Sequence, residues 1–393
     1  MKGYEQKVYL NNAATSWPKP DCVALAVSQA LRSLPGDAGR GGIREFDVFD
    51  QVRKKLAALL GVACPERIAL GSNSTWGLNQ AVFGFPLEPG DRVLTTKAEH
   101  NAVLRPLYRL EKQGIQVICL DVDKTGRLEP EVWKTAVRKY RPRLCVLIHA
   151  SNVTGAVNDA ETLTAMAKDA GAAMLLDISQ SLGWISVEME KWGADMAAFT
   201  GHKYLLGPQG TGGLYVRPGL TLDPYVLGGT GVKSNLKEMP EEMPLHLEAG
   251  TGNEPSYHGL LAALQWAEEN PLDREKTEEI LRYLKKGLRD LGCRVIQPEP
   301  PVTPVLSFTI PGWHPGEVGD ILSGSYDIIC RTGLHCSPRI MENLGTPQGT
   351  IRLSLSRFTK RADADRVLEA VTAMCGDQME ETRKRRIHFK DGI

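Results

Sequence analysis

The sequence predicts an α/β protein with a large, mostly parallel sheet and a second, smaller α+β domain. Seven short aliphatic runs alternate with longer helical patterns between residues 67 and 217. Strands that are apolar along their whole length are typical of parallel sheets whose two faces are covered by helices. The length of 393 residues exceeds one ordinary hydrophobic core, so we expect more than one domain.

The seven aliphatic runs are the predicted strands of the large sheet. They comprise residues 67–70, 91–96, 115–121, 143–150, 172–179, 195–200 and 212–217. Helical patterns separate them, for example "LEPEVWKTAVRKY" at 128–140 and "DAETLTAMAKDAG" at 159–171. Ligands of such sheets bind at the carboxyl ends of the strands. Several polar residues of interest fall at these positions.

The pattern changes after about residue 258. Two amphipathic helical patterns and four short apolar strands follow, at residues 260–270, 275–292, 294–297, 304–310, 327–333 and 350–356. We therefore predict a large domain at 15–258 and a small C-terminal α+β domain at 259–393. The extended N-terminal segment 1–14 is expected to pack near the small domain.

The composition argues against several classes of protein. Lys+Arg and Asp+Glu both number 47, so no net charge draws the chain to nucleic acid or to an acidic membrane. No run approaches the roughly 18 apolar residues of a membrane helix. The first residues lack the apolar core of a signal peptide. We expect a cytoplasmic protein whose eight scattered cysteines are thiols.

Two residues at predicted strand ends indicate the chemistry. Lys203 follows a strand through a Thr-Gly-His turn and precedes the glycine-rich run "GPQGTGG" at 207–213. Asp177 ends the preceding strand. A lone lysine is usually a surface charge, and a lone glycine run is weak evidence for phosphate binding. An enzyme that uses pyridoxal 5'-phosphate, however, needs both a lysine for a Schiff base and a carboxylate facing the pyridine nitrogen.

Eleven motifs in order along nearly the whole chain resemble the class V aminotransferase family. Within it they are most similar to the cysteine desulfurases of the SufS-like group and their selenocysteine lyase relatives. The motifs are "YLNNAATSWPKP" (9–20), "RGGIREFD" (40–47), "GSNSTWGLN" (71–79), "AEHNAVLRP" (98–106), "HASNVTGAVND" (149–159), "LLDISQSLG" (175–183), "FTGHK" (199–203), "LGGTG" (227–231), "LEAGTGNEP" (247–255), "RTGLHC" (331–336) and "IRLSLSRF" (351–358).

The resemblance implies a fold and an assembly. The fold would be the type I pyridoxal-phosphate-dependent, aspartate aminotransferase-like fold. Its large domain is a seven-stranded α/β/α sandwich, and its small C-terminal domain is α+β. The family usually forms a homodimer with the active sites at the interface.

The resemblance also implies roles around the cofactor ring. Lys203 would form the Schiff base, and we expect its pKa to be depressed so that it can act as nucleophile and base. Asp177 would pair with the pyridine nitrogen, and Gln180 would donate to the phenolic oxygen. His100 would stack on the ring and relay protons, although a lone histidine at a strand end is more often structural.

Further residues match the family's phosphate-binding positions. Ser74 and Thr75 fall where a strand should give way to a helix, whose free N–H groups suit phosphate. N-capping is the alternative role for both. Thr200 and His202 flank the lysine turn, and Thr230 matches a loop that reaches the phosphate of the neighbouring subunit.

Asn152 and Arg352 resemble the pair that binds the substrate carboxylate. Arginine suits this task because its planar fork makes two parallel hydrogen bonds. Asn152 would also contact the cofactor, and Arg331 is expected to bind the substrate as well. Without the resemblance, a salt bridge on an edge strand would be the default role of Arg352.

The stretch "CRTGLHCSP" at 330–338 has three interpretations. A zinc site needs about four ligands, and no second Cys/His pair with suitable spacing accompanies it. Burial in a core is the default for Cys330, inside the apolar "DIIC". Cys336 instead sits in a glycine-containing loop beside His335, and it matches the cysteine that takes the substrate's sulfur.

The resemblance thus implies a cysteine desulfurase. L-cysteine would give L-alanine and a persulfide on Cys336, which passes to a protein or thiol acceptor. Selenocysteine lyase and other C–S lyase activities are close alternatives, with L-selenocysteine as the substrate of the first. A non-catalytic, cofactor-binding regulator is the alternative from another class. Leu334 stands where SufS-like proteins often have a second histidine, so proton handling in this loop stays open.

Overall fold

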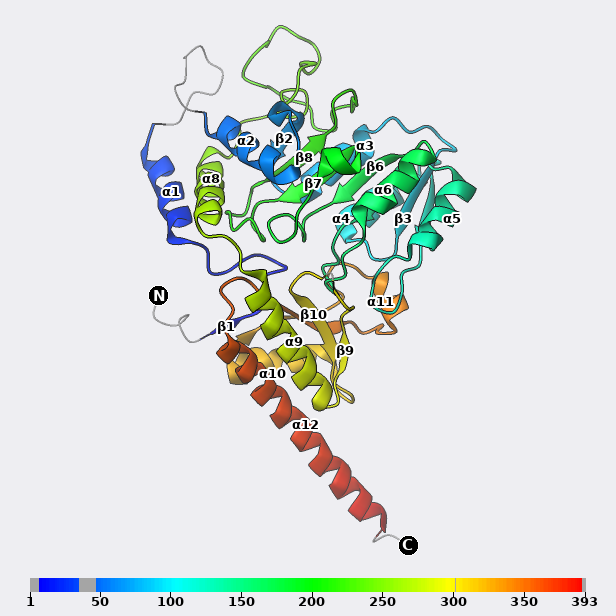
Figure 1. Cartoon of the computed structure of the whole chain (residues 1–393), viewed down its shortest axis with the longest axis vertical. Helices are drawn as coiled ribbons and strands as arrows, with labels where there is room; N and C mark the ends of the chain where they lie inside the picture. Colours follow the sequence, from blue (N-terminus) through cyan, green and yellow to red (C-terminus); the bar gives the residue numbers. More distant parts are fainter. Residues whose placement is uncertain (1–6, 35–46, 301, 391–393) are drawn as a thin grey trace.

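The chain folds into two packed parts joined through the N-terminal segment and helix α8 (Figure 1). This computed structural model describes residues 7–34, 47–300 and 302–390, with side chains of the last helix as far as residue 376. The motif "RGGIREFD" lies outside the described residues except for its last residue. None of the described helices is both long and apolar enough to cross a membrane.

A seven-stranded sheet forms the larger part, as predicted. Its order is β2-β8-β7-β6-β5-β3-β4, and only β8 runs against its neighbours. The strands are β2 (Ile68–Gly71), β3 (Arg92–Thr96), β4 (Gln116–Leu120), β5 (Leu144–Ile148), β6 (Ala173–Asp177), β7 (Met196–Thr200) and β8 (Gly212–Val216). Each coincides with a predicted strand, because strands that are apolar on both faces leave a clear signal.

Helices cover both faces of this sheet, so its strand residues alternate between two cores. Along β6, Met174 and Leu176 face one core and Leu175 faces the other. Helices α3 (Ser74–Gly84) and α4 (Asn101–Glu111) cover the Leu175 face. The opposite face packs against α2 (Val48–Leu60), α5 (Pro130–Tyr140), α6 (Ala160–Asp169), α7 (Met189–Trp192) and α8 (Glu254–Glu269).

The smaller part has a four-stranded antiparallel sheet in the order β12-β13-β10-β9. Its strands are β9 (Arg294–Ile296), β10 (Val305–Thr309), β12 (Arg331–Gly333) and β13 (Thr350–Ser354). Its helices are α9 (Arg274–Asp290), α10 (Pro315–Tyr326), α11 (Ile340–Leu344) and α12 (Arg361–Lys390), the last of which extends away from the body (Figure 1). A second core fills the space between this sheet, α9, α10 and α12.

The predicted strand 327–333 is two strands in the structure. The chain changes partner at Cys330, so that β11 (Ile328–Ile329) pairs in parallel with β1 (Val8–Tyr9) and β12 pairs with β13. The N-terminal segment continues from β1 to an isolated bridge between Asn11 and Ser354. Apolar periodicity alone does not reveal which partner each half takes.

Helix α8 connects the two parts. Its side chains Leu260, Leu261 and Leu264 belong to the core beneath the large sheet, whereas Leu281 and Leu284 of α9 belong to the second core. The predicted division at residue 258 falls inside α8, and the exact domain limits stay a prediction.

Candidate active site

Predicted site residues follow five strands of the large sheet at one edge. Ser74 and Thr75 come after β2, His100 after β3, Asn152 after β5, Asp177 at the end of β6 and Lys203 after β7. Six of the seven strands run the same way, so their carboxyl ends lie together. The sheet topology therefore gathers residues that are up to 129 positions apart in the sequence.

Lys203 has the electrostatics expected of a reactive amine. Its pKa is lowered from 10.5 to about 8, chiefly by burial; Asp177 opposes this effect, and Arg352 and Arg331 add to it. The predicted depression of this pKa is thus confirmed. A larger fraction of the amine is uncharged at neutral pH than for a surface lysine.

Asp177 and Gln180 are both buried, and Gln180 contacts the N-terminal segment. Oδ1 of Asp177 accepts hydrogen bonds from the backbone N–H and the hydroxyl of Ser179, which hold the carboxylate in one orientation. The Nε2 of Gln180 donates to the carbonyl of Ala13 at 2.9 Å, and its Oε1 is buried without a partner in the described structure. One N–H of Gln180 is left for the donor role that was predicted for it.

His100 is a neutral imidazole held by its own helix. Its Nδ1 accepts the backbone N–H of Ala102 at 3.0 Å and caps α4, so the ring proton sits on Nε2. Burial lowers its pKa to about 4, and the positive charge of Lys203 acts in the same direction. His100 can therefore offer an N–H at neutral pH without carrying a charge.

The N-terminus of α3 faces the end of β7. Asn73 is the N-cap, and its Oδ1 accepts the backbone N–H of Trp76. Asn73, and neither Ser74 nor Thr75, therefore caps this helix. A Cβ at Gly212, which pairs with Thr200, would come 2.6 Å from the Asn73 Cα, so glycine permits this close approach.

Thr200 lies beside this helix end, His202 follows two residues later in the chain, and Thr230 lies in a separate loop. The Nδ1 of His202 is buried without a partner in the described structure, and burial lowers its pKa to about 4. The Thr200 hydroxyl donates to the carbonyl of Thr211 at 3.3 Å. The Thr230 hydroxyl donates to Val232 within its own loop, and no described contact connects it to the Lys203 group.

Arg331 and Arg352 are directly opposite each other in the β12–β13 pair. Like charges at such positions repel. Arg352 is only 1% exposed, and it bonds to the carbonyl of Asn152 at 2.9 Å and to Oδ1 of Asn11 at 3.0 Å. Burial, followed by Arg331, lowers its pKa to about 10. Its hydrogen-bond partners are neutral, so this buried guanidinium can attract an anion.

The Cys336 thiol lies against Arg331. Nη2 of Arg331 is 2.9 Å from Cys336 Sγ, and the thiol is half-buried. Cys330 differs, because it packs against the second core and burial raises its pKa to about 11. Arg352 also acts on the Cys330 thiol, but it does not outweigh burial there, whereas Cys336 has an arginine at hydrogen-bonding distance from its sulfur.

Three residues near this group were not predicted from the sequence. Asn11 holds Arg352, Ser337 bonds to Asn152, and Glu99 is buried beside His100. Oε1 of Glu99 accepts from the Thr96 hydroxyl and from the Ile148 N–H, while Oε2 is buried without a partner in the described structure. Glu99 and Ser337 are the sequence neighbours of His100 and Cys336, and Asn11 lies in the matched motif at 9–20. These positions were the only indication in the sequence that the three residues belong to the site.

The carboxyl group of Glu99 predicts a pH-dependent stability. Burial raises its pKa from 4.5 to about 8, and the charge of Asp177 adds to this effect. The folded state therefore keeps a proton that the unfolded state loses. The stability contributed by the neutral acid is full below pH 4.5 and is lost as the pH rises through about 8. The loss is at most about 1.4 kcal/mol per pH unit.

Glu99→Gln should remove this titration. The free energy of unfolding of the variant, relative to wild type, is expected to increase between about pH 5 and pH 8 when both are unfolded with urea. Glu111→Gln, at the exposed last residue of helix α4, is the control and should show a constant difference. A constant difference for Glu99→Gln as well would contradict the prediction.

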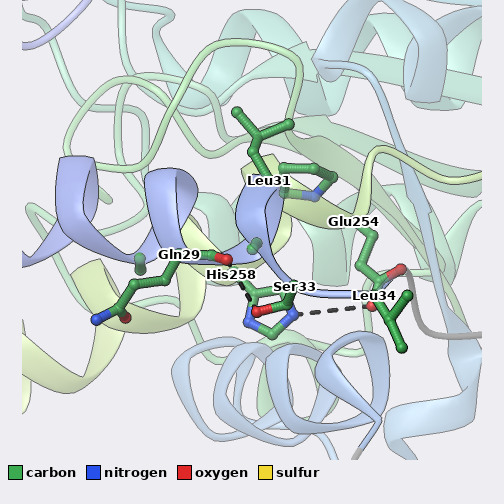
Figure 2. A pocket seen from close by; sticks show the side chains of 9 residues that line it. Gln29, Leu31, Ser33, Leu34, Glu254 and His258 are labelled. Carbon is green, nitrogen blue, oxygen red and sulfur yellow. Dashed lines mark hydrogen bonds and ion pairs between the residues drawn. The ribbon is translucent and has the colours of Figure 1, made fainter.

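A separate surface pocket of about 480 Å³ lies between α1 (Asp21–Arg32) and α8 (Figure 2). Leu31 and Leu34 line one side, and Glu254 and His258 line another, with 3.8 Å between Glu254 Oε1 and His258 Nε2. No predicted site residue contributes to its lining.

The large sheet, the small antiparallel sheet and the lysine between them define the class of protein. The chain belongs to the aminotransferase class-V family, whose pattern it matches over residues 8–367.

Within that family, its relatives share one name. The chain is 30% identical over 384 residues to a protein named "Probable cysteine desulfurase" from Methanothermobacter thermautotrophicus, covering 94% of this chain and 95% of the relative. It superposes on the apo cysteine desulfurase of Thermococcus onnurineus NA1 with a TM-score of 0.86 and 28% identity, over 94% of this chain and 95% of that one. For the Escherichia coli cysteine desulfurase CsdA in its S-sulfonic acid form, the TM-score is 0.84 and the identity 26%, over 95% and 96% of the two chains.

Proposed function

We propose that this protein is a pyridoxal-phosphate-dependent cysteine desulfurase that converts L-cysteine to L-alanine and takes the sulfur on Cys336. The observation that carries the proposal is the position of Cys336 Sγ, 2.9 Å from Arg331 and electrostatically coupled to Lys203. A nucleophilic thiol beside the reactive lysine has no task in simple transamination. The names of the relatives support the same activity.

The donor set at the strand ends fits the cofactor. Lys203 is a lysine of lowered pKa, and Asp177 has one carboxylate oxygen held by Ser179 and the other left for a pyridine nitrogen. At the other end, the buried Nδ1 of His202 lacks a partner and α3 begins beside Thr200. This end suits a phosphate, because N–H groups and hydroxyls converge there. When bound, the cofactor supplies an electron sink for the substrate's α-carbon.

Arg352 of the small sheet would bind the substrate, and Lys203 and His100 of the large part would handle its protons. Arg352 offers a buried guanidinium to the carboxylate, and Asn11 and the Asn152 carbonyl fix its plane. Lys203 can remove the α-proton because its amine is partly uncharged at neutral pH. His100 holds a proton on Nε2 and can donate a hydrogen bond without adding positive charge.

Sulfur transfer would follow from the position of Cys336. Its thiolate attacks the sulfur of the substrate, so an S–S bond forms while the substrate C–S bond breaks. The electron pair of the C–S bond stays with carbon, which takes up a proton and becomes the methyl group of alanine. The outer sulfur of the persulfide then passes to an acceptor thiol, which becomes a persulfide while the Cys336 thiol is restored. A dithiol such as dithiothreitol instead reduces the persulfide and becomes its own cyclic disulfide, so that sulfide leaves.

A product assay tests this proposal. The holoenzyme is incubated with L-cysteine and dithiothreitol, and alanine and sulfide are measured together. Equal amounts of both products are expected. Their absence from a cofactor-loaded protein would favour the non-catalytic, regulatory alternative.

Selenocysteine lyase is the second candidate, and the same assay separates it. Equal rates of alanine release from L-cysteine and L-selenocysteine would favour the desulfurase. Activity with L-selenocysteine alone would favour the lyase. The half-burial of Cys336 against Arg331 favours the desulfurase, because a lyase does not require a positioned thiol.

A homodimer in the cytoplasm is the proposed setting. The loop that contains Thr230 carries apolar side chains that are exposed in the single chain, namely Tyr225, Leu227 and Leu236. Such side chains suit a contact with a second copy, which would bring Thr230 to the partner's site. A sulfur acceptor, either a protein or a small thiol, is implied by the persulfide.

A further inference from the structure

The loop around Cys336 has an unusual backbone. His335 and Cys336 have φ angles of 53° and 59°, so two consecutive residues with side chains adopt the left-handed conformation. L-residues other than glycine disfavour this region, and they persist there only when their surroundings hold them. The contacts that hold this loop therefore decide where Cys336 Sγ lies.

The side chain of Asn152 bonds to the residues on both sides of Cys336. Its Nδ2 donates to the carbonyl of His335 at 2.8 Å, and its Oδ1 accepts from the hydroxyl of Ser337 at 2.9 Å. All three residues are buried, with exposures of 4%, 2% and 0% for Asn152, His335 and Ser337. A third hydrogen bond, from the Asn101 N–H to the carbonyl of Cys336 at 2.7 Å, fixes the peptide group that joins Cys336 to Ser337.

The His335 ring is an anchor rather than an acid or base. The Ser307 hydroxyl donates to the Val153 carbonyl, and the Thr350 hydroxyl donates to Ser307 Oγ at 3.1 Å. Thr350 Oγ1 must therefore accept from His335 Nε2, which lies 2.8 Å away. The ring is thus a neutral Nε2–H tautomer, and burial, with Arg352 and Arg331, keeps its pKa well below the usual value.

The same asparagine also contacts the substrate side of the site. Its backbone carbonyl accepts from Arg352 Nη1 at 2.9 Å. Asn152 follows β5 of the large sheet, whereas Ser337 and Arg352 belong to the smaller part. One residue thus links the arginine predicted to bind the carboxylate to the loop that carries the sulfur nucleophile.

We propose that Asn152 and Ser337 form a clamp that positions Cys336 for attack on the substrate's sulfur. The Asn152 side chain then acts on the nucleophile, in addition to any contact with substrate or cofactor. Ser337 becomes a positioning residue that touches neither of them. The kinetic part of this inference rests on the proposed desulfurase activity, whereas the backbone part does not.

Hydrogen exchange of the holoenzyme tests the backbone part. In Ser337→Ala, the amides of residues 333–337 are expected to exchange at least about tenfold faster than in wild type, because the buried Asn152 Oδ1 loses its donor. Ser186→Ala removes an exposed hydroxyl that bonds to Glu188, and it should leave this segment unchanged. Unchanged exchange in Ser337→Ala would overturn the clamp, whether or not the enzyme desulfurates cysteine.

Steady-state kinetics tests the functional part. Ser337→Ala should lower kcat for L-cysteine about tenfold, while KM and the visible absorption of the bound cofactor stay within about twofold of wild type. Asn152→Ala should lower kcat as well, and the double variant should lose little more than Asn152→Ala, because both act through one bond. Normal kcat in Ser337→Ala, or losses that multiply in the double variant, would refute the proposal.

Discussion

Lys203→Ala is expected to abolish covalent attachment of pyridoxal phosphate and to lower turnover of L-cysteine by at least about 10³-fold. Lys203 is the lysine that the strand ends bring beside Asp177, and burial lowers its pKa to about 8. Alanine supplies neither the amine that binds the cofactor nor the base that removes the α-proton. Borohydride reduction followed by mass spectrometry measures attachment, and alanine release measures turnover.

Two further variants separate the chemistry of Lys203 from its charge. Lys203→Arg keeps a cation but removes the nucleophilic amine, so it should be as inactive as Lys203→Ala. Lys191→Ala, at an exposed lysine that pairs with Glu161, should keep both attachment and turnover. Covalent cofactor in Lys203→Ala would show that another lysine forms the bond.

Cys336→Ala is expected to lower the production of both sulfide and alanine from L-cysteine by at least about 10³-fold, with normal cofactor attachment. The thiol is the only part of the site that can accept the sulfur in the proposed step, and Arg331 Nη2 lies 2.9 Å from it. Mass spectrometry of wild type after brief exposure to L-cysteine should find one additional sulfur atom on the peptide that contains Cys336.

Cys330→Ala is the matched control, six residues upstream. Cys330 packs against the second core, and burial raises its pKa to about 11, so its loss should affect stability more than sulfur transfer. Alanine release from L-selenocysteine that survives in Cys336→Ala would point to a lyase in which the thiol is dispensable. Full desulfuration of L-cysteine by Cys336→Ala would contradict the proposed nucleophile.

The large sheet could be predicted because its strands are buried on both faces. Runs such as the one ending in Asp177 are apolar throughout, and the structure places each predicted strand within one residue or a few of its expected limits. Lys203 and Asp177 could be predicted together from their strand ends, whereas a role for His100 follows only from the resemblance to the family. The motif around Cys336 distinguished it from Cys330, a difference that follows here from burial and from Arg331.

The smaller part was harder to predict, because its short strands depend on their partners. The run 327–333 has one apolar pattern, yet β11 pairs with the N-terminal β1 and β12 pairs with β13. The packing of helix α8 could not be predicted either. Its amphipathic pattern indicates a buried face, but only the structure shows that this face packs into the core of the large sheet. Register and partner choice are properties of two segments, and a single segment does not encode them.

The sequence by itself determined the class of fold, because apolar strands alternating with helices leave a clear pattern, and it predicted roles for Lys203, Asp177 and Cys336 through the order of its motifs along the chain. Only the tertiary structure decided how these parts act on one another. It set Arg331 opposite Arg352, turned the amide of Asn152 toward the cysteine loop, and buried Glu99 next to His100. The bonds of the Asn152 side chain join residues as far as 185 positions apart in sequence, so they form only once the two sheets have packed together.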